Sequence, residues 1–154
     1  MNPTIQKSIL GMLFFSSSLM AQNKQLEKLW ETDTILKVPE SVLLDKEKNI
    51  IYFSNIDGQP LDKDMKGSIG TCNTDGKNIN NDWVTGLSAP KGMAIYKNQL
   101  YVSNIDELVI IDIPTAKIKQ HIPVMNAVFL NDVTIDDNGI VYVSDSKTEL
   151  IHRI

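Results

Sequence analysis

The sequence contains few of the residues that mark several common classes of protein. Cys72 is the one cysteine among 154 residues, so no intramolecular disulfide can form and the core must be stable without one. The thiol has no CxxC partner, and the only histidines are His121 and His152; we expect structural roles for all three side chains. Lys and Arg form no block and the net charge is -4, which gives no electrostatic footprint for a nucleic-acid backbone. No nucleic-acid partner is therefore expected.

Long hydrophobic runs are also missing after the first residues, so no later stretch approaches the eighteen or more apolar residues of a membrane span. Residues 1–21 carry Lys7, an apolar run from Ile9 to Phe15 and a small residue, Ala21, before polar Gln22. This pattern is typical of a secretory signal peptide; a buried helix or an uncleaved anchor is the alternative. We expect a mature protein that begins near residue 22, is periplasmic or secreted, and has no membrane attachment.

The rest of the chain alternates short apolar runs with turn residues. Between Phe129 and Ser146, the turn Asp136-Asp137-Asn138-Gly139 separates two runs whose apolar residues recur with a period of two. These residue types tolerate the left-handed backbone of a tight turn, and the period of two is that of a half-buried strand. The stretch therefore predicts a β-hairpin.

The hairpin occurs three times, and each copy ends in a tetrad of aromatic, apolar, Ser and Asn or Asp residues. The tetrads begin at Tyr52, Tyr101 and Tyr142, 49 and 41 residues apart, which is the length of one four-stranded propeller blade. The expected hairpins are Ser41 to Asp45 with Ile50 to Asn55, Gly92 to Tyr96 with Gln99 to Asn104, and Asp132 to Asp136 with Ile140 to Asp145. Further strands are expected at Gly67 to Asn73, Asn78 to Val84, Glu107 to Asp112, Ile118 to Ile122 and Glu149 to Ile154.

We therefore predict an all-β protein, a partial β-propeller of about three blades over residues 39–88, 89–128 and 129–154; an antiparallel sandwich is the alternative. Residues 22–38 form an N-terminal segment that would suit the outer strand of a ring-closing blade. Closed propellers have about four to eight blades, so three would leave two apolar faces open. The chain is then either a fragment or a protein that associates with itself through these faces. The polar residues after the second strands are expected to be strand-terminating turn residues: Asn55, Asp57, Asn104, Asp106 and Asp145.

Three motifs resemble the SMP-30/gluconolactonase/LRE-like superfamily of six-bladed propellers, with NHL-type propellers as relatives. They are Pro39 to Asp45 with Ile51 to Ile56, Ala89 to Ala94, and Asn131 to Asp136 with Tyr142 to Asp145. The resemblance runs from about Leu26 to Ile154 and corresponds to the N-terminal half of a family member. It implies a divalent cation, usually calcium, at the mouth of the central channel, and hydrolysis of sugar lactones in catalytic members.

The resemblance also assigns roles to individual residues. Glu40 matches the family's metal-ligating glutamate, and Asn131 matches its channel-lining asparagine, which contacts metal or substrate. Lys91 takes the equivalent place in the second unit, where its ammonium could meet a substrate. The other interpretations are a solvated strand-start residue for Glu40, an Asx-turn residue for Asn131 and a surface lysine for Lys91.

These roles lead to two hypotheses about function. In the first, the full-length protein is a calcium-dependent hydrolase of the sugar-lactone type, or binds a small sugar-derived ligand. The catalytic base and a further metal ligand would come from later blades, so this chain alone is not expected to be active. In the second, the protein is a non-catalytic NHL-like scaffold that binds a protein or glycan partner.

Overall fold

The computed structural model describes residues 26–154, and the predicted signal peptide, residues 1–21, lies outside them. Within the described range the chain forms eleven strands in three antiparallel sheets and no helix. Blade 1 comprises β1 (Pro39–Asp45), β2 (Ile50–Asn55), β3 (Gly67–Asn73) and β4 (Asn80–Leu87). Blade 2 comprises β5 (Pro90–Tyr96), β6 (Gln99–Asn104), β7 (Glu107–Asp112) and β8 (Lys117–Pro123). Blade 3 comprises β9 (Leu130–Ile135), β10 (Val141–Asp145) and β11 (Leu150–Arg153).

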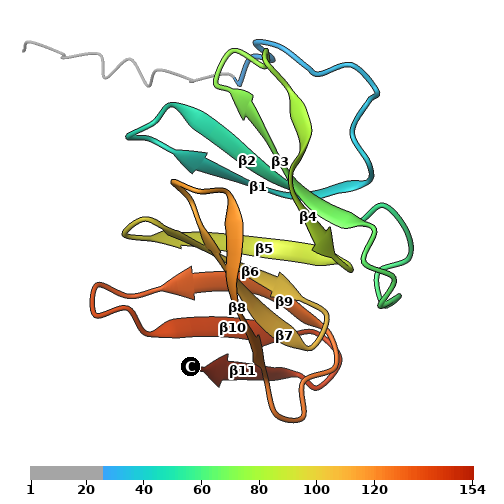
Figure 1. Ribbon diagram of the computed structural model, residues 1–154, viewed down its shortest axis with the longest axis vertical. Coiled ribbons are helices and arrows are strands. Elements are labelled where there is room, and N and C mark those ends of the chain that lie inside the picture. The colour runs from blue at the N-terminus through green and yellow to red at the C-terminus, as the bar shows by residue number, and fades with distance from the viewer. Residues whose placement is uncertain (1–25) are drawn as a thin grey trace, which may run out of the picture.

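Each blade is a simple up-and-down sheet in which consecutive strands are neighbours. The three sheets are stacked from blade 1 to blade 3 (Figure 1). The first strands of the blades lie side by side, since β1 contacts β5 and β5 contacts β9. This arrangement confirms the predicted all-β partial propeller. Among the described residues no helix has the length and hydropathy that a membrane crossing needs.

The turns form where the sequence offers residues that tolerate a left-handed backbone. Asn49 and Lys97 have φ values of 55° in the first-to-second-strand turns of blades 1 and 2, and Gly139 has a φ of 85° in blade 3. A φ above zero is readily adopted by Gly and more often by Asn than by most residues; Lys97 is the exception, since lysine adopts it less often. The three hairpins therefore form at the turns that the sequence predicts.

The core lies between the blades, in two layers. The first layer joins blades 1 and 2: Tyr52 belongs to one buried cluster with Met93 and Val102 of blade 2, and Trp83, whose ring lies 5.0 Å from that of Tyr52, packs against this cluster. The second joins blades 2 and 3 and includes Leu130 and Val143, both 0% exposed. Burying a side chain of this size stabilises the fold by about 1.5–3 kcal/mol. The faces between blades therefore hold the stack together without a disulfide.

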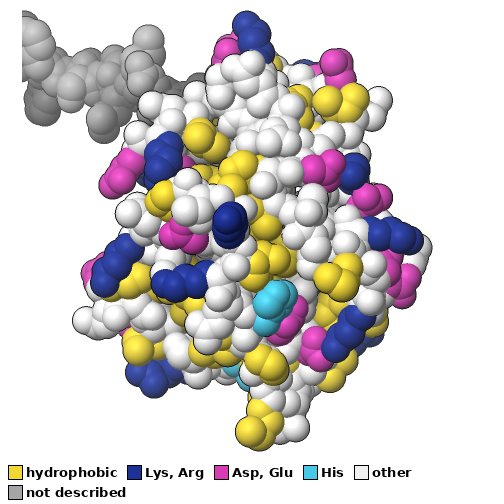
Figure 2. Space-filling model, viewed as in Figure 1, with side chains coloured by type: hydrophobic (Ala, Val, Ile, Leu, Met, Phe, Trp, Pro, Cys, Tyr) yellow, Lys and Arg dark blue, Asp and Glu magenta, His cyan; other side chains and the backbone are white. Residues whose placement is uncertain are grey.

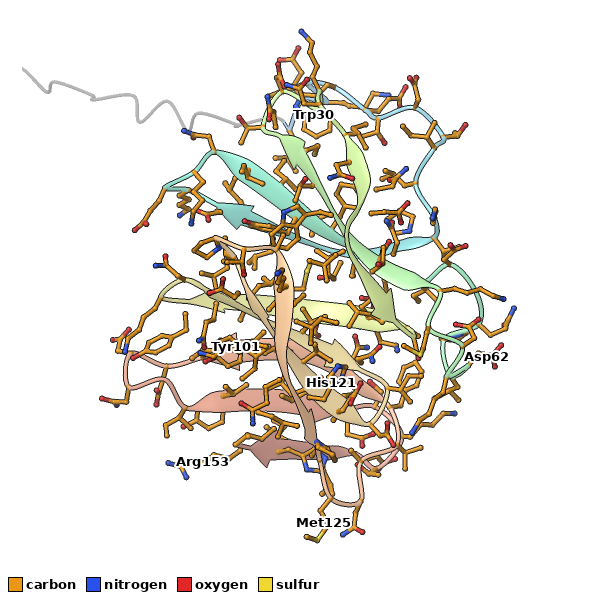
Figure 3. All side chains as sticks on the ribbon, viewed as in Figure 1. Trp30, Asp62, Tyr101, His121, Met125 and Arg153 are labelled. Atoms are coloured by element: carbon orange, nitrogen blue, oxygen red, sulfur yellow. The ribbon has the colours of Figure 1, made fainter. Side chains whose placement is uncertain are left out.

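Residues 26–38 form no strand in this structure and instead run along the outside of blade 1 (Figure 1). Trp30, at the top of the stack in Figure 3, donates its indole N–H to the carbonyl of Thr74 at 3.1 Å. The Asn81 amide donates to the Ile35 carbonyl at 2.9 Å, and Lys37 pairs with Asp82 at 3.1 Å. The predicted ring-closing strand is thus not formed within the single chain, and its place in a complete ring stays a prediction.

Candidate functional site

Glu40, Lys91 and Asn131 occupy equivalent places, each as the second residue of the innermost strand of its blade. The preceding residues pair with the last residue of the tetrad in every blade: Pro39 with Asn55, Pro90 with Asn104, and Leu130 with Asp145. Directly after each pair the register shifts, because the inner strand carries an extra residue. Such β-bulges redirect a side chain away from the regular alternation of a strand. The three residues predicted from the sequence therefore lie at the same end of the three inner strands, where β1, β5 and β9 begin. We call this end the inner-strand mouth.

The inner strands of blades 2 and 3 approach each other closely at this mouth. A Cβ atom on Gly92 would lie 2.5 Å from the carbonyl oxygen of Asn131 and 2.6 Å from the Cα of Asp132. The hydroxyl of Ser103 donates to the same Asn131 carbonyl. A residue with a side chain would not fit here, so Gly92 allows the close spacing of the strands that carry Lys91 and Asn131.

Lys91 is buried rather than a surface lysine. Its residue is 1% exposed, and its ammonium donates to the carbonyls of Ala89 at 2.9 Å and Pro60 at 3.1 Å. The Phe129 ring lies under the charge, with its centroid 4.5 Å from Nζ. Burial lowers the pKa of Lys91, while the nearby charge of Glu40 acts to raise it. The ammonium is thus held by the chain beneath the mouth, and in this structure it has almost no contact with solvent.

Glu40 is an exposed charge of the mouth. Partial burial of the carboxyl raises the pKa of Glu40; the charge of Lys91 opposes this shift and that of Asp132 adds to it. Asp132 is itself exposed, and half-buried Asn131 donates weakly to the Ser146 hydroxyl at 3.4 Å. The mouth therefore presents two carboxylates and an amide above a buried positive charge.

The last residue of the tetrad has a role that the sequence did not reveal. Asn104, expected to be a turn residue, is 5% exposed, and its side-chain oxygen accepts the N–H groups of Ser88 and Ala89, both at 3.0 Å. Asp145 does the same for Val128 at 2.7 Å and Phe129 at 3.1 Å. These clamps fix the chain one and two residues before the inner strand begins, and therefore two and three residues before the mouth residue. The sequence feature that could have indicated this role is the recurrence of Asn or Asp at the last position of each tetrad.

Asp145 also accepts the N–H groups of Lys147 and Thr148. Burial acts to raise the pKa of Asp145, but the four backbone donors outweigh it and lower the pKa to about 2. The ionised carboxylate is therefore part of the folded structure of blade 3.

Asn55, the corresponding residue of blade 1, lacks this clamp. Its amide nitrogen donates to Asn81 O at 3.2 Å and to the Ser68 hydroxyl at 3.4 Å, but its buried side-chain oxygen has no hydrogen-bond partner. The residues that would supply the two N–H groups are Lys37 and Val38, directly before β1. Val38 has a φ of 58°, so the chain enters blade 1 in a different conformation.

The mouth residues do not by themselves fit the calcium ion that the family resemblance implies. Calcium takes about six to eight oxygen ligands. Across residues 26–154, no three His, Cys, Asp or Glu side chains lie close enough together to hold a metal ion. Glu40 and Asn131 offer oxygen ligands, but the charge of Lys91 acts on the same carboxylate. The calcium prediction thus depends on ligands from outside the described part of the chain.

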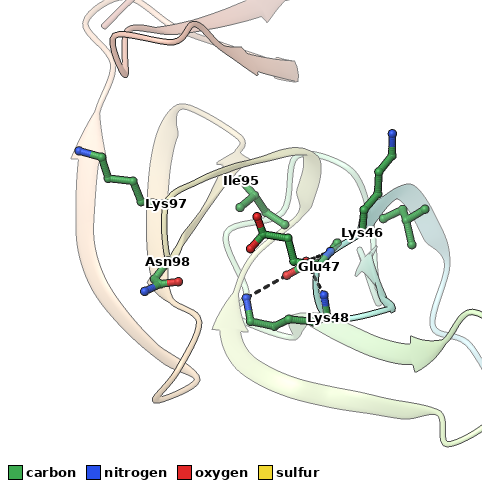
Figure 4. A pocket seen from close by; sticks show the side chains of 8 residues that line it. Lys46, Glu47, Lys48, Ile95, Lys97 and Asn98 are labelled. Carbon is green, nitrogen blue, oxygen red and sulfur yellow. Dashed lines mark hydrogen bonds and ion pairs between the residues drawn. The ribbon is translucent and has the colours of Figure 1, made fainter.

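The opposite end of blades 1 and 2 holds a pocket of about 430 Å³ between two hairpin turns. Its lining includes Asp45, Lys48 and Lys97 (Figure 4). The Asp45 carboxylate is already bonded to the N–H groups of residues 47 and 48 and to the Lys48 ammonium at 3.1 Å. The polar groups of this pocket thus stabilise the turn, and the mouth is the better candidate site.

Comparisons with known proteins support the fold and leave the family open. No family model matches the sequence, and a search of curated proteins finds no match. A search of solved structures matches eighteen chains. One, from the crystal structure of a nidogen/laminin complex, has a TM-score of 0.62 and 18% sequence identity, over 79% of this chain and 44% of that one. This likeness supports a β-propeller fold, and the chain spans less than half of the length of that neighbour. The SMP-30-like resemblance gains no support from these comparisons.

Proposed function

We propose that this protein is a binding propeller whose inner-strand mouth takes a small, hydroxyl-rich ligand of the sugar-derived class. The observation that carries the proposal is the equivalence of Glu40, Lys91 and Asn131, which follow the same register shift at the start of β1, β5 and β9. Three blades thereby contribute one polar side chain each to one place, as a binding site on a rigid scaffold requires.

The chemistry of the mouth suits a ligand with several hydrogen-bond donors. The exposed groups are the carboxylates of Glu40 and Asp132 and the half-buried amide of Asn131. Carboxylates accept charge-assisted hydrogen bonds from hydroxyl groups, which are stronger than neutral ones. The buried Lys91 ammonium acts from beneath the mouth through its charge, which offsets part of the negative charge of Glu40.

These residues support binding of the ligand without a metal ion. Lactone hydrolysis would need a Lewis-acidic cation and a base within hydrogen-bond reach of the attacking water. The described residues offer no cluster of three acidic or histidine ligands for the cation. A calcium-dependent hydrolase would therefore have to draw its remaining ligands and its base from further blades.

The test is a thermal-shift panel of sugars, sugar acids and sugar lactones, recorded in EDTA and then in millimolar calcium. A ligand at 100 times its dissociation constant should stabilise the fold by about 2.7 kcal/mol, and the shift should be present in EDTA. Glu40→Gln and Asn131→Ala should remove it, whereas Asp137→Asn, in the exposed β9–β10 turn, should not. A shift that appears only with calcium would favour the hydrolase. No shift for any ligand would contradict binding at the mouth.

The scaffold hypothesis is favoured by one feature, the long β2–β3 loop over residues 56–66. It leaves the strand end that adjoins the mouth and exposes Leu61 and Met65, at 45% and 67%. Exposed apolar side chains on a loop are common contacts for a protein or glycan partner. The test is binding of the protein to a glycan array. Binding that is lost in Leu61→Ser and Met65→Ser, but kept in Glu40→Gln, would support this second function.

A further inference from the structure

The loop between β2 and β3 differs from the corresponding loops of the other two blades. It spans residues 56–66, whereas β6 and β7 are joined by residues 105–106 and β10 and β11 by residues 146–149. Its two ends lie close together, because the strands that it joins are paired up to their ends. The loop, on which Asp62 is labelled in Figure 3, stands out from the side of the stack (Figure 1). Compact loops with adjacent ends are frequently functional.

Both ends of the β2–β3 loop have a backbone conformation that suits a hinge. Asp57 has a φ of 49° and Met65 has a φ of 59°. This left-handed region is unfavourable for residues other than glycine, and more so for Met than for Asp. Hinges are terminal residues of a loop that absorb changes in φ and ψ, and a strained residue keeps its conformation only where its surroundings hold it. Release of the loop would therefore allow both residues to relax.

Beyond Asp57, three polar contacts connect the loop to blade 2 or to the residues that lead into it. They are the hydrogen bond from the Lys91 ammonium to the Pro60 carbonyl at 3.1 Å, the ion pair of Lys63 with Asp106 at 2.6 Å, and the hydrogen bond from the Met65 N–H to the Ser88 hydroxyl at 3.3 Å. The two side chains of the ion pair are 62% and 40% exposed, and an ion pair in contact with water stabilises a contact only weakly. The attachment to blade 2 is therefore easily released.

The loop also buries little apolar surface. Ile56, its first residue, belongs to a small buried cluster with Ala89 and Ile105. From Gly58 to Lys66 every residue except half-buried Asp64 is exposed. Segments with few buried apolar contacts open at a lower free energy than the core of a protein. Lifting the loop beyond Ile56 would therefore break the three polar contacts and expose almost none of the core.

We propose that the β2–β3 loop is a gate of the inner-strand mouth, which turns on its two left-handed residues, lifts from blade 2 and exposes the Lys91 ammonium. In the closed state Lys91 is 1% exposed and donates to the carbonyls of Pro60 and Ala89. Opening removes the Pro60 acceptor and leaves that of Ala89, so the ammonium gains a free donor for a ligand oxygen. As a gate for a ligand, the loop rests on the proposed function. Its motion is tested without a ligand, so the gate can fail while binding at the mouth stands, and the reverse.

The first test measures the exposure of Lys91, by acetylation of the full chain with N-hydroxysuccinimidyl acetate under native conditions and mass spectrometry of its peptides. Lys63→Gln removes the ion pair with Asp106, so Lys91 should be acetylated about threefold faster, or more, than in the wild type. Lys66→Gln is the matched control, because Lys66 pairs with Asp64 inside the loop, and it should leave the Lys91 rate unchanged. Equal Lys91 rates in the three proteins would overturn the gate. A faster rate in Lys63→Gln that a lower urea midpoint fully explains would also overturn it.

The second test asks whether the loop moves as a unit, by hydrogen exchange of individual amides. The Met65 N–H donates to Ser88, which leads into blade 2, whereas the Asp62 N–H donates to the Gln59 carbonyl within the loop at 3.2 Å. In Lys63→Gln the Met65 amide should exchange about threefold faster or more, and the Asp62 amide should keep its wild-type rate. Equal acceleration of both amides would show local unfolding in place of a hinged gate. An unchanged Met65 amide would overturn the release of the loop from blade 2.

Discussion

At the residue scale, the tetrad explains most of the mouth, because each of its positions has a separate physical task. In blades 1 and 3 the serine hydroxyl accepts the N–H of the residue after the bulge, as Ser54 does from Ser41 and Ser144 from Asp132, both at 3.0 Å. In blades 2 and 3 the last residue accepts the N–H groups of the incoming chain. The sequence indicates the repetition of these residues, but the clamp partners belong to a loop that arrives from another blade. That contact is long-range, so local turn propensity could only assign Asn104 and Asp145 to turns.

The Asp145 clamp predicts a pH-dependent loss of stability. The pKa of Asp145 is lowered to about 2, below its usual unfolded value of about 3.9. A lowered pKa stabilises the fold above the unfolded pKa, and this contribution is lost as the pH falls from about 4 toward 2. The difference corresponds to about 2 kcal/mol at neutral pH. Urea unfolding of the wild type and Asp145→Asn should differ by about this amount at pH 7 and converge near pH 2. A difference that stays constant with pH would show that the charge has no role.

Lys91 predicts a structural effect as well as a binding effect. In Lys91→Met the carbonyls of Ala89 and Pro60 lose their buried donor, which should lower the free energy of unfolding by about 1–3 kcal/mol. The β2–β3 loop should also become more sensitive to limited proteolysis. Lys97→Met is the control, because the Lys97 ammonium lies over the Tyr96 ring at the opposite end of the blade, 4.9 Å from its centroid. Equal stability and equal proteolysis of the two variants would contradict a role of the buried Lys91 ammonium in holding the β2–β3 loop.

At the element scale, the strands follow from alternation and turn chemistry, and the exceptions have local causes. The outer strand of blade 1 was expected at Asn78 to Val84 but is β4, Asn80–Leu87, because Asn78 has a φ of 54° and belongs to the turn. The bulges after Pro39, Pro90 and Leu130 could not be predicted, since a bulge is a property of two paired strands. Residues 26–38 form no strand and are held beside blade 1 by long-range contacts, such as that of the Trp30 indole with the Thr74 carbonyl, which a local sequence pattern cannot predict.

The close approach of β5 and β9 predicts that Gly92→Ala is destabilising. The new Cβ would meet backbone atoms of Asn131 and Asp132 at 2.5 and 2.6 Å, and backbone cannot move aside as a flexible side chain can. Overpacking of this kind costs about 1–3 kcal/mol, and the separation of the mouth residues should also change. Gly58→Ala is the control, because its Cβ would lie 3.2 Å from the end of the Asp64 side chain. Denaturant midpoints that fall equally in both variants would contradict a special role for Gly92.

At the scale of the whole molecule, the three stacked blades place polar residues where their inner strands begin. Charges of both signs are interspersed over the face visible in Figure 2, as expected from a sequence with no block of one sign.

The most direct measurement of the central claim, a binding mouth at the start of the inner strands, is a map of amide chemical shifts during ligand titration. Uniformly labelled protein would be titrated in EDTA with the sugar-derived compound that gives the largest thermal shift. The account predicts that the changes cluster at residues 39–41, 90–92 and 130–132, and that Glu40→Gln removes them. Changes confined to the hairpin pocket at residues 44–48 and 95–98, or to the β2–β3 loop, would contradict it.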